Sequence, residues 1–315
     1  NQGCVGGLFA GRLGCAVNPE TGNELRLDQA EIGTADKPKR VVIVGGGLAG
    51  MEAARVAALR GHDVVLFEAQ PKLGGTINIA AKLPTRHGIA DIAFWLEAEI
   101  YRHGVDVRLS SYVDQDEILA ERPDAVIVAT GSMPRMDGIQ NSNPGEPIEG
   151  VDAPHVLSST DLLMDGRNWR GSSAVVLDDL GHYEAAGVAD LLVREGADVI
   201  FVTPFTSFAP KVENALMTEP VLERMAKAEG NFTLLTRHRI RKIGNDQVEI
   251  APTFDGPSFA VPSETVVLVT PNSPLRDIYE LFDGKVAELV IVGDANSPRD
   301  LQKAIYEGHV AARKL

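Results

Sequence analysis

Apolar runs recur along the chain, and each is followed by a turn and then by a stretch with helical spacing. The first run covers residues 40–44, Arg-Val-Val-Ile-Val, and a helical stretch follows it before a second apolar run at residues 63–67. Uninterrupted apolar runs of this length are typical of strands buried in a parallel sheet. The alternation of strand and helix therefore predicts a βαβ unit at the start of an α/β domain.

The same order returns twice further along the chain. Residues 172–203 give strand, turn, helix and strand again, and residues 288–308 give strand, turn and helix. We expect the last of these strands to complete the sheet that begins at Val41, so that the first domain is discontinuous. The predicted fold class is α/β, with two doubly wound dinucleotide-binding-type domains, the second inserted in the first. The predicted boundaries are 1–39 for an N-terminal segment and linker, 40–159 plus 271–315 for the first domain, and 160–270 for the insert.

The first turn carries the pattern Gly45-x-Gly47-x-x-Gly50 between a strand and a helix. Such glycines turn the chain tightly and let the backbone approach a pyrophosphate at the positive end of the helix. Glu68 ends the second strand, where a carboxylate can accept hydrogen bonds from both hydroxyls of an adenosine ribose. Strand, glycine turn, helix and acid in this order predict a dinucleotide site.

Composition and charge narrow the possible partners. A chain of 315 residues that is 44% hydrophobic is long enough for about two domains. Its net charge of −14 disfavours nucleic acid and anionic membranes, which would repel it. Without a signal peptide or an apolar run of the ~20 residues that span a bilayer, a cytoplasmic protein is expected.

The turn of the inserted domain departs from the glycine pattern. It reads Asp178-Asp179-Leu180-Gly181-His182-Tyr183, with carboxylates and a bulky aromatic ring where glycines are expected. An ionised pair at this helix N-terminus would repel a pyrophosphate. We therefore expect the insert not to bind NAD(P)H in the usual way. His182, Tyr183 and Glu184 are titratable, but residues at a helix start more often cap or pack, and no catalytic residue is assigned.

Cys4 and Cys15 are the only cysteines, and both lie in a glycine-rich N-terminal segment. Two cysteines alone suggest free thiols or one disulfide, because a metal or iron–sulfur cluster normally needs four ligands. Their context is more specific. Asn-Gln-x-Cys, a spacer, and Cys-x-x-Asn-Pro resemble the second half of the four-cysteine [4Fe–4S] motif in the NADH:flavin oxidoreductase group. That group includes trimethylamine dehydrogenase, histamine dehydrogenase and 2,4-dienoyl-CoA reductase.

Further motifs support this resemblance. Gly74 and Gly75, in Pro-Lys-Leu-Gly-Gly, resemble the loop after the ribose-binding acid, and Ala-Thr130-Gly131 resembles the family's Ala-Thr-Gly motif. Gly293-Asp294 and the run after it resemble the C-terminal signature, in which the aspartate binds a ribityl hydroxyl. The cofactor contacts that the resemblance and the glycine pattern imply come from Gly45, Gly47, Leu48, Ala49, Gly50, Glu68, Ala69, Gly74, Gly75, Thr130, Gly131, Gly293 and Asp294.

The resemblance implies that the chain is part of a larger oxidoreductase. An FMN-binding barrel would precede it, and upstream cysteines would complete a [4Fe–4S] cluster with Cys4 and Cys15. The first domain would bind FAD and take part in electron transfer. Two alternatives stay open: a redox-silent docking module that holds ADP, and an NAD(P)H-dependent reductase half. An electron-transferring flavoprotein is a possible partner, and the full-length protein is expected to form a homo-oligomer.

Overall fold

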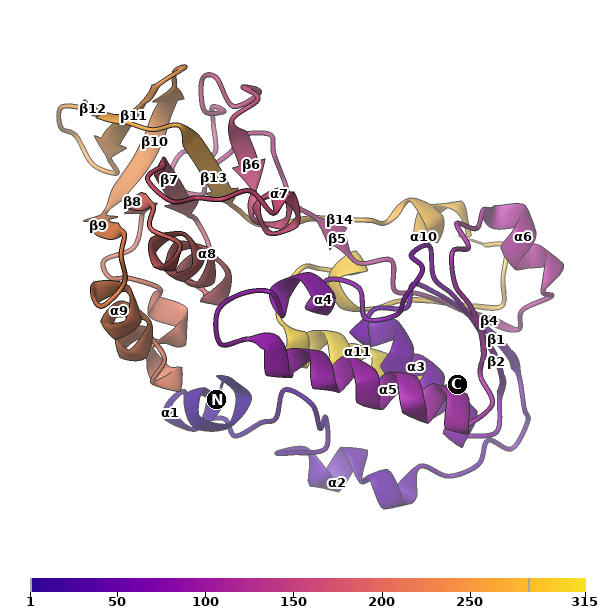
Figure 1. Cartoon of the computed structure of the whole chain (residues 1–315). Coiled ribbons are helices and arrows are strands. Elements are labelled where there is room, and N and C mark those ends of the chain that lie inside the picture. The colour runs from indigo at the N-terminus through magenta and orange to yellow at the C-terminus, as the bar shows by residue number, and fades with distance from the viewer. Residues whose placement is uncertain (1, 283) are drawn as a thin grey trace. The chain divides into compact units, whose positions relative to one another are not determined.

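The computed structural model describes residues 2–282 and 284–315 and contains two compact units (Figure 1). Asn1, the first residue of the Asn-Gln-x-Cys element, lies outside the described residues. Of the described residues, 11–81, 87–133, 273–282 and 284–315 form the unit named here the Gly45 unit, and 2–10, 82–86 and 134–272 form the Asp178 unit. The chain therefore leaves the Gly45 unit and returns to it, as the predicted insertion requires.

A five-stranded parallel sheet forms the centre of the Gly45 unit, in the order β15-β4-β1-β2-β3. Its strands are β1 (Arg40–Val44), β2 (Asp63–Phe67), β3 (Asp106–Arg108), β4 (Ala125–Val128) and β15 (Glu288–Ile291). β1 and β2 coincide with the predicted apolar runs and, like β4, are almost entirely buried, whereas the edge strands β3 and β15 are partly exposed.

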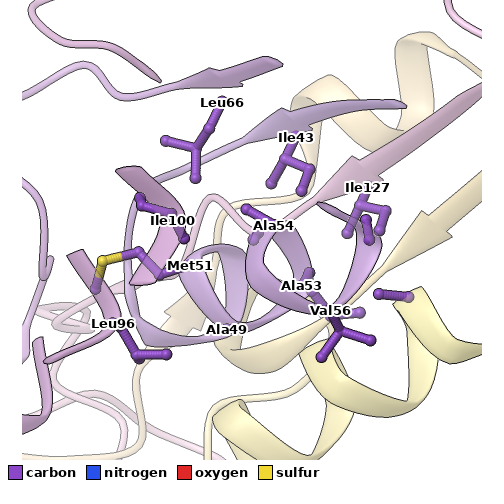
Figure 2. Close-up of a cluster of buried hydrophobic side chains, with 14 of the residues drawn as sticks. Ile43, Ala49, Met51, Ala53, Ala54, Val56, Leu66, Leu96, Ile100 and Ile127 are labelled. Atoms are coloured by element: carbon purple, nitrogen blue, oxygen red, sulfur yellow. The ribbon is translucent and has the colours of Figure 1, made fainter. Parts of the chain in front are cut away.

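Helices cover both faces of this sheet. The larger core lies on the side of α3 (Leu48–Leu59), α5 (Asp91–Arg102) and α11 (Leu301–Arg313), where Ile43, Leu66 and Ile127 point from the strands toward the helices (Figure 2). Alternate strand residues, among them Val42 and Val126, point to the other face and pack against Ile118 of α6 (Gln115–Ala120) and Phe282 after α10 (Asp277–Leu281). The alternation of side chains along each strand thus fills two separate cores.

Short elements complete the Gly45 unit. β5 pairs with β14 in an antiparallel ribbon. The remaining elements are α2 (Glu24–Leu27), η2 (Gln29–Glu31), α4 (Ile77–Ala80), η3 (His87–Ala90), β5 (Ser132–Met133), β14 (Ser273–Pro274) and η5 (Gly293–Ala295).

The Asp178 unit has a second five-stranded parallel sheet, in the order β6-β13-β7-β8-β9, and a three-stranded antiparallel sheet of β10, β11 and β12. The parallel strands are β6 (Val156–Ser158), β13 (Thr265–Val269), β7 (Ser173–Asp178), β8 (Asp198–Thr203) and β9 (Asn231–Thr236). The antiparallel strands are β10 (His238–Ile243), β11 (Gln247–Pro252) and β12 (Phe259–Pro262). The helices are α7 (Ser159–Asp165), α8 (Tyr183–Arg194), α9 (Thr218–Ala226) and η4 (Pro210–Ala215), with η1 (Gln2–Gly6) and α1 (Gly7–Phe9) from the N-terminus.

The division between the units differs from the predicted boundaries. The inserted unit begins at residue 134 and not at 160, because Gln140 and Asn141 hydrogen-bond to Ile240 and Asp179 within it, and because β6 pairs with β13 in the second sheet. The predicted segment 1–39 is also divided, since residues 2–10 belong to the Asp178 unit and 11–39 to the Gly45 unit. Close packing explains the first part: a Cβ atom on Gly6 would lie 3.4 Å from the Ala215 Cβ in η4.

Candidate functional site

The candidate site lies at one edge of the Gly45 unit's sheet. Because all five strands are parallel, the residues that follow β1, β2, β4 and β15 lie at the same edge. Those residues are the ones that the sequence singled out: the glycine turn after β1, Glu68 after β2, Thr130 and Gly131 after β4, and Gly293-Asp294 after β15. A crevice at the carboxyl ends of such strands is where doubly wound sheets bind ligands.

The three glycines of the turn have different structural reasons. A Cβ atom at Gly45, where φ is +108°, would lie 2.3 Å from the Ala129 carbonyl oxygen, and one at Gly50 would lie 1.9 Å from the Gly45 carbonyl oxygen. These two glycines are required by the protein's own packing. A Cβ atom at Gly47 would meet nothing within 4 Å. Packing does not explain Gly47, whereas a ligand that approaches the turn would.

Helix α3 begins directly after this turn with Leu48, Ala49 and Gly50. Gly47 is its N-cap, in extended conformation, and no side chain caps the helix. The first amides of a helix have no partner within it, and the helix dipole places partial positive charge there. The N-terminus of α3 is therefore suited to an anion such as a pyrophosphate.

Glu68 is buried beside the turn, with 7% of its surface exposed. Its carboxylate accepts hydrogen bonds from the Gly46 amide at 2.6 Å and the Gln70 amide at 2.7 Å. A carboxylate offers about four acceptor positions, so two remain for hydroxyl groups. Ala69, next in the chain, is exposed at the same edge.

The loop that contains Gly74 and Gly75 folds back onto the glycine turn. The Gly74 amide donates to the Gly46 carbonyl oxygen at 2.9 Å, and Gly74 forms a parallel bridge with Gly47. A Cβ atom at Gly75, where φ is +58°, would lie 3.2 Å from the Gly47 Cα. The two glycine-rich segments that the sequence identified separately are thus brought together.

Thr130 and Gly131 connect β4 to the segment before α10. The Thr130 hydroxyl donates to the Leu275 carbonyl oxygen at 2.5 Å, and the Leu275 amide donates to the Gly131 carbonyl oxygen at 3.0 Å. The hydroxyl of Thr130 therefore has a structural partner. A Cβ atom at Gly131, where φ is +79°, would meet nothing within 4 Å, so the surroundings of this glycine also leave room for a ligand.

Asp294 lies after the neighbouring strand β15, in η5. Its carboxylate accepts hydrogen bonds from the Arg299 amide at 3.2 Å and the Ser132 hydroxyl at 3.3 Å. Gly293 has φ of +64°, and a Cβ atom there would lie 2.8 Å from the Ala49 Cβ. This glycine lets η5 pack against the start of α3, so that Asp294 lies in the same unit and at the same edge as the glycine turn.

The corresponding turn of the Asp178 unit is filled by its own side chains. Asp178 is fully buried at the end of β7, and its Oδ1 accepts hydrogen bonds from the Gly181 amide at 2.7 Å and the Leu180 amide at 3.2 Å. A Cβ atom at Gly181 would lie 2.8 Å from the Phe205 ring and 3.2 Å from Pro210. The amides and the space that a phosphate would need are therefore already in use.

The aspartate pair differs in one respect from the sequence-based expectation. The pair precedes α8, whose N-cap is His182, and does not stand in the first helical turn. Burial raises the pKa of Asp178 and of Asp179 to about 6, against the opposing effect of backbone amides that donate to each carboxylate. Asp179 accepts from the Asn141 amide at 2.7 Å. Both groups are still mainly ionised at neutral pH, so a nearby phosphate would be repelled.

Sequence analysis missed a buried ionic group behind the glycine turn. His309 of α11 lies with its Nδ1 2.7 Å from Glu52 Oε1, and Arg55 donates to both oxygens of Glu52 at 2.8 and 2.7 Å. Burial would raise the pKa of Glu52, but the hydrogen bonds from Arg55 and His309 outweigh it and hold that pKa below its usual value. Glu52 and Arg55, with i,i+3 spacing in an otherwise apolar helix, are the signal that could have identified it.

The two cysteines are free thiols. Cys4 is exposed in η1 of the Asp178 unit, and Cys15 is half-buried in the Gly45 unit. Across residues 2–282 and 284–315, no group of three or more histidine, cysteine or acidic side chains is placed to hold a metal ion. Among the helices of the same residues, none is long and apolar enough to cross a membrane.

Comparison with known proteins gives matches over the whole chain. Residues 40–266 match the family model of the FAD dependent oxidoreductases. Bilirubin reductase of Mediterraneibacter gnavus is 35% identical over 318 residues, which cover 100% of this chain and 46% of that protein. The chain spans about half the length of the curated relatives it matches.

Two solved structures of amine-oxidising enzymes have the same fold. The 6-hydroxypseudooxynicotine amine oxidase of Pseudomonas geniculata N1 is 29% identical with a TM-score of 0.92, over 99% of this chain and 48% of that one. Histamine dehydrogenase from Rhizobium sp. 4-9 is 25% identical with a TM-score of 0.92, over 100% of this chain and 50% of that one.

Proposed function

Because the chain belongs to the family of FAD dependent oxidoreductases, we propose that its Gly45 unit binds FAD at the carboxyl edge of its sheet. In this proposal the N-terminus of α3 receives the pyrophosphate, Glu68 receives the adenosine ribose, and Asp294 receives a ribityl hydroxyl. Bound FAD would supply redox chemistry, and the chain's own residues would bind and orient it.

The observation that carries this proposal is the open approach at Gly47. The turn glycines on either side of it are required by packing, and Gly47 is not. The helix that follows lacks a side-chain cap, and a buried carboxylate lies beside it with acceptor positions to spare. A nucleotide accounts for all three features together, since it supplies the anion, the ribose hydroxyls and the reason for a missing side chain.

The direct test is to denature the purified protein and to identify the released nucleotide by mass spectrometry. FAD is the expected result. ADP would favour the second candidate function, a docking module that holds a nucleotide without redox chemistry. Release of no nucleotide from protein saturated with FAD and then desalted would contradict both.

We further propose that the chain is part of a longer FMN-containing enzyme, since it spans about half of its relatives. Cys4 and Cys15 would supply two ligands to a [4Fe–4S] cluster, and upstream cysteines would supply the others. An N-terminal FMN barrel would oxidise the substrate, and an electron-transferring flavoprotein would accept electrons. In the full-length protein, Cys4→Ala or Cys15→Ala should abolish the iron content measured by colorimetric assay. Iron that survives either change would contradict this assignment.

Because the turn of the Asp178 unit is filled by its own side chains, we propose that NAD(P)H does not bind there and that electrons do not enter at this turn. Asp178 already accepts from the Leu180 and Gly181 amides, and its charge would oppose a second anion. Titration calorimetry with NADH should show no binding to the chain. Micromolar affinity would favour the alternative, an NAD(P)H-dependent reductase half.

A further inference from the structure

A small cavity lies inside the Asp178 unit. It is bounded by the segment 82–86, by α8 and by α9, and the volume open to the centre of a water molecule is about 10 Å³. That is room for about one water molecule.

Three buried polar atoms at this cavity have no hydrogen-bond partner among the described residues. They are the Tyr183 hydroxyl, Asp190 Oδ1 and the Thr218 hydroxyl, and all three residues line the cavity. Asp190 is only 1% exposed. Folded proteins leave few buried polar atoms unpaired, so three at one cavity indicate a shared polar ligand.

The charges that line the cavity and its small volume indicate which ligand fits. Arg224 donates to Asp190 Oδ2 from Nε at 3.0 Å and from Nη2 at 2.7 Å, so the aspartate charge is already paired. A cation would bring a second, uncompensated charge into the cavity, and an anion would be repelled by Asp190. A water molecule can donate to Asp190 and exchange hydrogen bonds with both hydroxyls, which gives the three bonds typical of buried water. We propose that one water molecule binds here and is shared by Tyr183, Asp190 and Thr218.

This water site would help to hold the segment 82–86 against α8 and α9 within the Asp178 unit. The Arg86 guanidinium lies 3.7 Å from the centre of the Tyr183 ring. Leu83 packs so closely on α8 that a Cβ atom at Gly187 would lie 2.9 Å from its Cδ1. The water hydrogen-bonds to the Tyr183 hydroxyl, and the Tyr183 ring contacts the Arg86 guanidinium. The aromatic residue that replaces a glycine of the dinucleotide pattern thereby has a structural function.

A double-mutant cycle tests whether one water joins two of these groups. Tyr183→Phe and Thr218→Val each remove one hydroxyl and should each lower the thermal midpoint by roughly 2–4 °C. The double variant should fall by about as much as one single variant, because both lose the same water. Tyr101→Phe is the matched control, since that ring is 51% exposed and its loss of a hydroxyl should change nothing.

Hydrogen exchange tests whether the water helps to hold this segment. The Arg86 amide donates to the Leu83 carbonyl oxygen at 3.0 Å, so its exchange reports on the segment 82–86. Tyr183→Phe should speed that exchange several-fold, and Tyr101→Phe should not. A crystal structure should show density for one water within hydrogen-bond distance of all three groups. Additive losses in the cycle, unchanged midpoints, or density for a larger group would each overturn the proposal, whichever nucleotide the Gly45 unit holds.

Discussion

The turns after β1 and β7 occupy equivalent places in two sheets of the same type. The helix after β1 has no capping side chain, whereas a side chain accepts hydrogen bonds from the turn amides after β7. After β1, the helix begins with a glycine N-cap and no capping side chain, so its amides are available to a ligand. After β7, Asp178 turns its carboxylate onto the amides of Leu180 and Gly181, and the Phe205 ring covers the turn. The Asp178 carboxylate therefore accepts hydrogen bonds that a bound phosphate would otherwise accept.

The comparison shows that a doubly wound fold does not by itself imply a dinucleotide site. Both sheets have the same strand pairing and both turns precede a buried helix. The difference lies in a few side chains that either leave the helix start open or close it. Function belongs to the site and not to the fold.

The largest effect is expected from closing the open turn. Gly47→Val adds a Cβ atom that would meet nothing within 4 Å, at a backbone φ of −71° that valine tolerates. The fold should therefore persist, while the nucleotide loses its approach to the α3 amides. We expect FAD affinity to fall by about 100-fold or more, equivalent to about 2.7 kcal/mol, in a fluorescence titration.

Gly88→Val is the matched control for this change. Gly88 also has nothing within 4 Å of an added Cβ atom, but it lies in η3 and not in the glycine turn. In the absence of FAD, both variants should unfold at the temperature of the wild type. If Gly47→Val kept the wild-type affinity, the pyrophosphate would not lie at this helix.

The second-largest effect is expected at the turn after β7, where the free energy of unfolding should depend on pH. The folded pKa of Asp178 is about 6, above the ordinary aspartate value of 3.8, so the unfolded chain ionises first as pH rises. Its contribution to stability is fully present below pH 3.8 and is lost as pH rises through 6. A pKa difference of one between the folded and unfolded chain corresponds to about 1.4 kcal/mol, so Asp178→Asn should raise the unfolding free energy by roughly 1–3 kcal/mol at about pH 8.

The asparagine Oδ1 can still accept from the Leu180 and Gly181 amides, so the turn should keep its shape. Denaturant unfolding at about pH 8 and about pH 4 measures the effect, which should vanish at the lower pH. A gain of equal size at both pH values would show that the change acts through packing and not through ionisation.

The smallest effect is expected at Glu68, beside the turn after β1, where we propose that the adenosine ribose binds. Glu68→Gln keeps one acceptor oxygen for the Gly46 amide, but it turns an NH2 group toward the Gln70 amide and removes the negative charge that strengthens hydrogen bonds from ribose hydroxyls. Nucleotide affinity should fall about tenfold, or about 1.4 kcal/mol. Titration of the FAD-free protein measures it, and an unchanged affinity would place the ribose away from Glu68.

Much of the Gly45 unit could be predicted from sequence because its signals are local. Val41, Gly45 and Gly50 act within one strand–turn–helix segment, and Glu68 ends the next strand. The boundary at 160 was less predictable, because β6 has only three residues, Val-Leu-Ser, and is recognised by its pairing with β13.

Contacts between distant segments could not be read from the sequence. The pairing of Glu52 with His309 joins residues 257 positions apart, and no local sequence pattern predicts it. The cavity beside Tyr183 likewise combines α8 with Thr218 and with the segment 82–86, which lies about a hundred residues earlier in the chain. Tertiary packing alone brings such groups together.

The tight crossing of α3 and α11 has a consequence for synthesis. The Gly308 backbone packs against the Ala49 carbonyl oxygen, where a Cβ atom would lie only 2.1 Å away, and β15 pairs with β4. The element that supports the glycine turn is therefore synthesised only after the whole Asp178 unit. A chain that stops before α11 would present Gly47 and Glu68 without the helix that packs against α3, so we expect stable nucleotide binding only after α11 has been translated.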